Sequence, residues 1–293
     1  MRNRFRSSLI ATAIAAATVS AVISVSMTRT AGQASRASRT ADGKPNLSGV
    51  WQANNEANWD LQAHQARPGA VTQRGVYPYA YAEVPAAPVL ALGAAAGVPG
   101  SLGVVQDDAQ IPYTSEAAAR KAENAAHWID RDPELKCYLP GIPRAMYMPY
   151  PFQIIHGNNE ILMAFPFASS DRVVHMTTPR KPVVDTWMGT SNGRWEGDTL
   201  VIDNTGFNDS TWFDRAGNFH SDKLHVVERI RPMTADALNY EVTIEDLDVF
   251  SRPWKITLVL YRRLEANLQL PEYKCVPFAE ELVFGYLRKY PTR

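Results

Sequence analysis

The segment Leu224-His-Val-Val-Glu-Arg-Ile230 alternates apolar and polar side chains, and the next two segments along the chain repeat this alternation. They are Leu238-Asn-Tyr-Glu-Val-Thr-Ile244 and Trp254-Lys-Ile-Thr-Leu-Val-Leu260. Successive side chains of a β-strand point to opposite faces of the sheet, so a period of two is typical of strands that bury one face. The three segments therefore predict neighbouring strands joined by polar turns.

Shorter apolar runs further upstream, bounded by Gly, Asn and Asp, predict additional strands. The turn signals Gly157-Asn-Asn159 and Gly197-Asp198 separate two pairs of these runs and predict hairpins. Eight or more short strands with local connections and no internal repeat predict an antiparallel β-barrel or sandwich. The runs are 49–51, 152–156, 160–165, 172–176, 194–196 and 199–203.

Two regions depart from the β pattern. A helix is predicted to begin at Thr114 or Ser115 and reach Trp128, with an apolar stripe of alanines at 118, 122 and 125, and Asp132-Pro133 ends it. Residues 54–112 are rich in Gln, Pro, Ala and Gly and predict a long irregular insertion, which either covers a functional site or is disordered. We therefore expect a single β-rich domain over 47–293 with an insertion at about 54–112.

The N-terminal residues 1–34 have the features of a secretory signal peptide. Three arginines precede an apolar run at 9–25, and small residues follow at 31–34. The alternative is a retained transmembrane anchor, although the run is short and poor in Leu. We expect cleavage, a flexible leader at 35–46, and a protein that is periplasmic or secreted in a Gram-negative envelope, without stable membrane insertion.

The composition limits the partners. Lys plus Arg and Asp plus Glu both number 30, so the formal net charge is +0. No basic excess draws the chain to nucleic acid, and we expect no such partner. Oligomeric state is not predicted by these features.

Cys137 and Cys275 are the chain's two cysteines. In an exported protein an even number of cysteines favours a disulfide, worth about 3–5 kcal/mol for so long a loop. The alternatives are two buried thiols or a metal pair, but the chain has no nearby CxxC or histidine partner.

Two resemblances concern the fold and the family. Gly49-Val50-Trp51 is similar to the Gly-x-Trp signature of lipocalin-like (calycin) barrels. The motif Gly193-Arg-Trp-Glu-Gly-Asp-Thr-Leu-Val-Ile-Asp203, followed by His220-Ser-Asp-Lys-Leu-His-Val-Val-Glu-Arg229, resembles a widespread family of exported bacterial proteins of unknown function. Cys137-Tyr-Leu-Pro-Gly-Ile-Pro-Arg144 adds to the second resemblance, which covers about 130–275. It implies export and supplies no mechanism.

Glu228 is the foremost catalytic candidate. It shares a strand face with Val226 and Ile230, whereas His225 faces the other way. A carboxylate on an apolar face is costly unless it is paired or functional. One interpretation pairs it with a buried arginine, for which Arg172, Arg194 and Arg252 are the candidates. The other makes it a general acid or base whose pKa is raised by the apolar wall.

Asp203 and His220 are the other catalytic candidates. Asp203 ends a strand near Glu228, so a carboxylate pair for glycoside cleavage is conceivable. His220 lies beside Ser221, but adjacent residues rarely form a catalytic pair and the chain has no Gly-x-Ser-x-Gly elbow. The six histidines show no metal-binding spacing, so we expect no metal and no cofactor.

The sequence leaves two main functions open and a third alternative beside them. The first is a calycin-like barrel that holds a small hydrophobic molecule in its interior. The second is an enzyme, a lyase, isomerase or hydrolase, that uses the same cavity, and the third is an envelope interaction protein. Large aromatics in loops and an arginine are the ligand-binding candidates. They are Tyr147, Trp187, Arg194 and Trp212.

Overall fold

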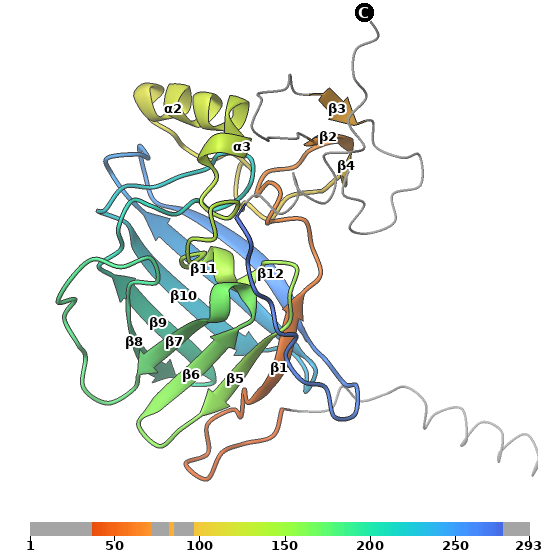
Figure 1. Cartoon of the computed structure of the whole chain (residues 1–293). Coiled ribbons are helices and arrows are strands. Elements are labelled where there is room, and N and C mark those ends of the chain that lie inside the picture. The colour runs from red at the N-terminus through yellow and green to blue at the C-terminus, as the bar shows by residue number, and fades with distance from the viewer. Residues whose placement is uncertain (1–36, 72–81, 85–96, 278–293) are drawn as a thin grey trace, which may run out of the picture. The chain divides into compact units, whose positions relative to one another are not determined.

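The computed structural model describes residues 37–71, 82–84 and 97–277, and the predicted signal peptide lies outside them. Nine strands close a barrel in the order β1-β12-β11-β10-β9-β8-β7-β6-β5 (Figure 1). The predicted mainly β fold is confirmed, in its barrel form. The barrel strands are β1 Gly49–Ala53, β5 Phe152–His156, β6 Glu160–Phe165, β7 Ser170–His175, β8 Thr190–Glu196, β9 Thr199–Thr205, β10 His225–Pro232, β11 Ala237–Glu245 and β12 Trp254–Arg262.

Most neighbouring strands are antiparallel, as expected from local hairpins. The predicted turns at 157–159 and 197–198 join β5 to β6 and β8 to β9. The pair β7 and β8 is parallel, with Val174 opposite Ser191, which the antiparallel prediction missed. A parallel pair needs a crossover connection, and the long segment 176–189 supplies it.

The barrel interior is filled by side chains. Burial alternates along β10, β11 and β12 with the period of two that the sequence shows. The inward residues pack into one hydrophobic cluster that includes Trp51, Phe152, Tyr240 and Trp254, each at most 2% exposed. Such a packed interior is typical of small barrels whose side chains meet at the axis.

The insertion holds more structure than an irregular loop. In its described part, β2 Arg67–Val71, β3 Ala82–Val84 and β4 Gly97–Val98 form a small sheet in the order β3-β2-β4. Further on, the backbone N–H of Thr257 in β12 donates to Val104 O, and that of Gln106 donates to Lys255 O. The end of the insertion therefore pairs with β12 beyond the residues that pair with β1.

The predicted helix is present with a different buried face. Helix α2 spans Ser115–Ala126, and the hydroxyl of Thr114 caps it by accepting from the N–H of Ala117. Helix α3, Trp128–Arg131, follows separately after His127. The buried residues of α2 are Ala117 and Asn124, so the predicted alanine stripe is wrong. On the buried face, the side-chain amide of Asn124 donates a hydrogen bond to Gly217 O at 3.4 Å.

Two 3-10 turns, Arg144–Met146 and Phe167–Ser169, complete the helical elements of the described residues. No helix among these residues is long and apolar enough to cross a membrane. Cys137 and Cys275 form the predicted disulfide, with 5.6 Å between their Cα atoms. It joins the segment after α3 to the chain that follows β12.

Candidate functional site

Five side chains form what we call the interior polar cluster: Arg172, Ser191, Asn204, Glu228 and Tyr240. Arg172 of β7 and Glu228 of β10 form an ion pair across the barrel. The hydroxyl of Tyr240 donates to Glu228 Oε1 at 2.6 Å, and the amide of Asn204 donates to Oε2 at 2.9 Å. Burial and the neighbouring Glu228 carboxylate raise the pKa of Tyr240 well above its usual value.

The charged and polar groups of this cluster form hydrogen bonds with one another. The guanidinium of Arg172 also donates to Ser191 Oγ at 2.9 Å and to Asn204 Oδ1 at 2.7 Å. Glu228 is 0% exposed, so its carboxylate has no contact with solvent. Both carboxylate oxygens accept hydrogen bonds from other members of the cluster. Arg172 was one of the three predicted partners. The geometry gives Glu228 a structural task, and its catalytic role stays a prediction.

Asp203 lies on the opposite face from Glu228. The register of β9 and β10 sets Asp203 opposite Val227, whose side chain points away from that of Glu228. Asp203 Oδ2 is 3.2 Å from Nε2 of His225, and Glu245 Oε2 is 3.2 Å from Nδ1 of the same ring. The structure does not bring the suggested carboxylate pair together, since one member faces solvent and the other the core.

His220 lies in the segment that joins β9 to β10. Its Nδ1 donates to Ser221 O at 2.8 Å, which leaves Nε2 to accept from the Thr211 hydroxyl at 2.6 Å. Burial lowers the pKa of His220. A hydroxyl bonded to an oriented imidazole is the arrangement of an activated nucleophile. Thr211 is only 2% exposed and its hydroxyl packs against Gly141, so the pair is closed to a substrate in this conformation.

The four predicted ligand-binding residues do not share one pocket. Tyr147 and Trp212 are buried, and the Tyr147 hydroxyl donates to Phe213 O. Arg194 is exposed on the outer face of β8 and pairs with Glu196. Trp187 is 37% exposed and lies beside Tyr138, with 6.0 Å between the ring centroids and an angle of 55° between the rings.

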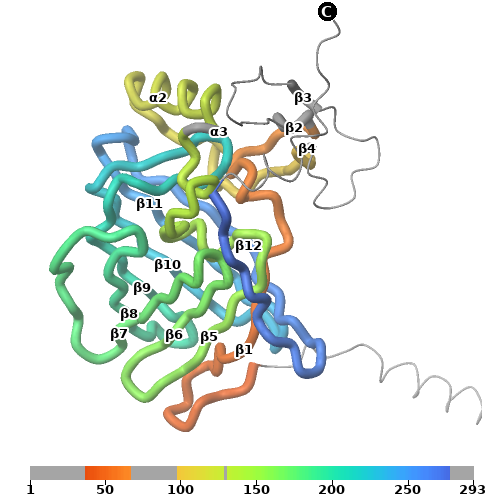
Figure 2. The backbone as a smooth tube through the Cα atoms, viewed as in Figure 1, coloured from red at the N-terminus to blue at the C-terminus, as the bar shows by residue number. Residues whose placement is uncertain are grey.

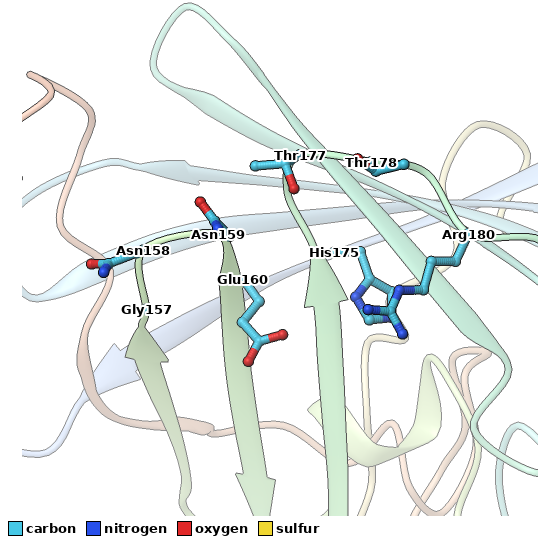
Figure 3. Close-up of a pocket in the computed structure, with 8 residues that line it drawn as sticks. All are labelled: Gly157, Asn158, Asn159, Glu160, His175, Thr177, Thr178 and Arg180. Carbon is cyan, nitrogen blue, oxygen red and sulfur yellow. The ribbon is translucent and has the colours of Figure 1, made fainter.

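A polar pocket of about 470 Å³ opens at the end of the barrel where β5 and β6 turn and β7 ends (Figure 3). We call it the rim pocket. It collects residues from the β5–β6 turn, from the last residue of β7 and from the segment that follows β7. They are Gly157, Asn158, Asn159, Glu160, His175, Thr177, Thr178 and Arg180.

The rim pocket contains one guanidinium, that of Arg180. The backbone of Arg180 is fixed because its N–H donates to Asn192 Oδ1 at 2.7 Å and its carbonyl accepts from Asn192 Nδ2 at 2.9 Å. Within the described part of the chain, the guanidinium of Arg180 forms no ion pair. Figure 3 shows it beside the imidazole of His175. Burial and the Arg180 charge lower the pKa of His175, and Glu160 opposes this shift.

Sequence patterns did not single out this pocket. His175 belongs to no metal-binding spacing in the sequence, and only the fold places it at the end of β7 in this pocket. Groups of three metal-binding side chains are absent among the described residues. Arg180 lies in a polar stretch that contains no motif. It lines the same pocket as the β5–β6 turn only because of the way the chain folds.

A second pocket, beside the disulfide, has a volume of about 30 Å³. That is room for about one water molecule. It adjoins a buried charge network in which Arg144 and Arg215 both pair with Glu134. The small volume and the satisfied charges give this pocket a structural character.

No family model, no curated protein and no solved structure matches this chain.

Proposed function

We propose that this chain is an exported binding protein whose filled barrel is a rigid scaffold and whose rim pocket takes a small polar ligand with a carboxylate group. The carrying observation is the Arg180 guanidinium, held beside His175 in a pocket of about 470 Å³ without a carboxylate partner among the described residues. Ligand pockets are typically about 300–1,000 Å³, so the volume suits a small molecule.

The lining favours an anion that also carries hydroxyl groups. Amides of Asn158 and Asn159 and hydroxyls of Thr177 and Thr178 offer donors and acceptors, and the planar guanidinium suits bidentate contact with a carboxylate. Glu160 disfavours a second negative group at its own side of the pocket. A singly charged hydroxy acid or sugar acid fits this pattern better than a phosphate.

The ligand is assigned to the rim because the interior is occupied. A hydrophobic molecule on the barrel axis would have to displace residues such as Trp51 and Tyr240, which are 0% exposed in the core cluster. A disulfide fits the oxidising compartment that an exported protein enters. The periplasmic location and the cleavage of residues 1–34 belong to the same proposal.

Isothermal titration with a panel of hydroxy acids, sugar acids, amino acids and inorganic phosphate tests it. We expect at least one carboxylate to bind, and Arg180→Gln to weaken its binding at least tenfold. Arg231→Gln is the matched control, because Arg231 is an exposed arginine on β10 outside the pocket. Absence of binding across the panel, or equal binding by Arg180→Gln, would refute the assignment.

A further inference from the structure

The segment that connects β7 to β8 carries an exposed apolar tip. Val183 is 95% exposed and Val184 is 68% exposed, and Trp187 lies just beyond them at 37%. All residues from 177 to 185 are exposed. Figures 1 and 2 show this segment as the green loop that projects from the side of the barrel. Two adjacent branched apolar side chains held in water are not explained by packing within the chain.

The loop is anchored on both sides of the tip. A Cβ atom at Gly206 would lie 2.5 Å from Cβ of Pro182, so the absence of a side chain lets Pro182 pack against the end of β9. Gly206 also has φ +73°, which other residues rarely adopt. After the tip, the N–H of Thr186 donates to Gly206 O, and its carbonyl accepts from Asn208. These contacts fix the loop on both sides of Val183 and Val184, and the two valines remain exposed.

Basic residues precede the tip. Arg180 and Lys181 are exposed, and Asp185 is the acid that follows. Lys223 forms its ion pair with Asp222, at 3.0 Å, and the pKa of Lys223 is raised chiefly by Asp222 and to a smaller extent by the charge of Asp185. Two basic residues therefore precede the apolar tip, and one acid follows it.

We propose that the loop tip docks on the surface of an anionic lipid bilayer, with Val183 and Val184 in the boundary between headgroups and acyl chains and Lys181 among the headgroups. Peripheral proteins bind membranes through a few apolar side chains together with nearby cations. A stable protein interface needs about 800 Å² from each partner, and two valines fall far short of that area. The inference is independent of the rim pocket, because neither valine lines it.

Vesicle sedimentation of the exported protein tests the proposal, with the N-terminus determined by intact mass. We expect binding to vesicles with phosphatidylglycerol and little binding to pure phosphatidylcholine. The double variant Val183→Ser/Val184→Ser should reduce the partition coefficient at least tenfold, and Lys181→Gln about fivefold. Leu102→Ser is the matched control, since Leu102 is 97% exposed outside the loop, and it should bind as the wild type does.

Three results would overturn the docking. They are undiminished binding by the double valine variant, an equal loss with Leu102→Ser, and no binding of the wild type to anionic vesicles. Urea unfolding of each variant confirms that the fold is intact, and exposed positions are expected to change stability little. Carboxylate binding at the rim pocket, measured on the same double variant, should be unchanged, which separates this proposal from the proposed function.

Discussion

The guanidinium of Arg262 lies over the indole of Trp51, with Cζ 4.2 Å from the ring centroid. Its Nη1 also donates to Ser48 O at 2.9 Å, while the indole N–H of Trp51 donates to Leu47 O at 2.8 Å. These contacts fasten the first strand of the barrel to the last. A Cβ atom at Gly49 would lie 2.1 Å from Arg262 Nη1, so the Gly-x-Trp pattern has a physical reason here.

Replacement of Gly49 should therefore weaken the closure of the barrel. We expect Gly49→Ala to lower the free energy of unfolding by about 2–4 kcal/mol, because the methyl group displaces Arg262 and the backbone is strained at φ +146°. Gly43→Ala is the control: Gly43 also has a positive φ, but nothing lies within 4 Å of the added atom. It should cost about 1 kcal/mol by strain alone. Equal losses in urea unfolding would contradict the role assigned to Arg262.

The interior polar cluster predicts strong coupling between two residues. Glu228→Leu leaves the buried guanidinium of Arg172 without its carboxylate and should cost about 3–5 kcal/mol. The double variant Arg172→Met/Glu228→Leu should cost less than the sum of the two single changes, by at least about 1 kcal/mol. The exposed pair Arg194 and Glu196, changed in the same way, should show coupling below about 0.5 kcal/mol. Additive losses at the buried pair would contradict the cluster.

Asp214 predicts a decline of stability with rising pH. Burial, and next the charge of Asp60, raise its pKa to about 7 from the ordinary value of 3.8. A group whose pKa is raised by folding contributes stability below its unfolded pKa, and that stability is lost as the pH rises through the folded pKa. The contribution, on the order of 4 kcal/mol, should disappear between about pH 4 and pH 7.

The check is the free energy of unfolding at several pH values for the wild type and for Asp214→Asn. The variant should have a flatter profile over that window, whatever its stability at one pH. Glu134→Gln is the opposite case. Burial raises the pKa of Glu134, but Arg215 and Arg144 outweigh burial and hold it at about 2, so its stability is lost only as the pH falls from about 4.5 through 2. An unchanged slope in Asp214→Asn would show that the group does not titrate in that range.

Ligand affinity at the rim pocket should rise at acid pH. Burial and Arg180 keep the pKa of His175 below its ordinary value, so the ring is neutral at pH 7 and gains its charge on acidification. A cationic imidazole beside Arg180 strengthens the attraction for a carboxylate, so binding should tighten from pH 7.5 to a pH well below the ordinary imidazole value of about 6.5. His175→Gln should remove this dependence and keep binding at pH 7.5. A carboxylate that binds equally at both pH values to the wild type would count against the assignment of His175.

Local patterns in the sequence predict much of the barrel. The alternation in β10, β11 and β12 and the turns at 157–159 and 197–198 appear at the predicted places because strand pairing between neighbours depends on local residues. The parallel β7–β8 pair was missed because it depends on the path of 176–189. There, Met176 passes over Gly193, where a Cβ atom would lie 2.4 Å from the Met176 sulfur.

The candidate site was less accessible from the sequence. The ion pair of Glu228 could be limited to three arginines because a buried carboxylate needs a cation, and the structure selects Arg172. The rim pocket could not be found in this way. Its residues come from a turn, a strand end and a loop, and no spacing along the chain links His175 to Asn158. The contact between Thr211 and His220 could not be predicted either, because the two residues meet only when the segment between β9 and β10 is folded.

The location of the ligand is tested most directly by nuclear magnetic resonance. A carboxylate that binds is titrated into the isotope-labelled protein, and the changes in backbone amide shifts are mapped onto the structure. We expect changes confined to residues 157–160 and 175–180, with inward residues such as Ile202 and Tyr240 unaffected. Changes centred on those inward residues would place the ligand inside the barrel and contradict the claim that the barrel is a filled scaffold with its binding site at the rim.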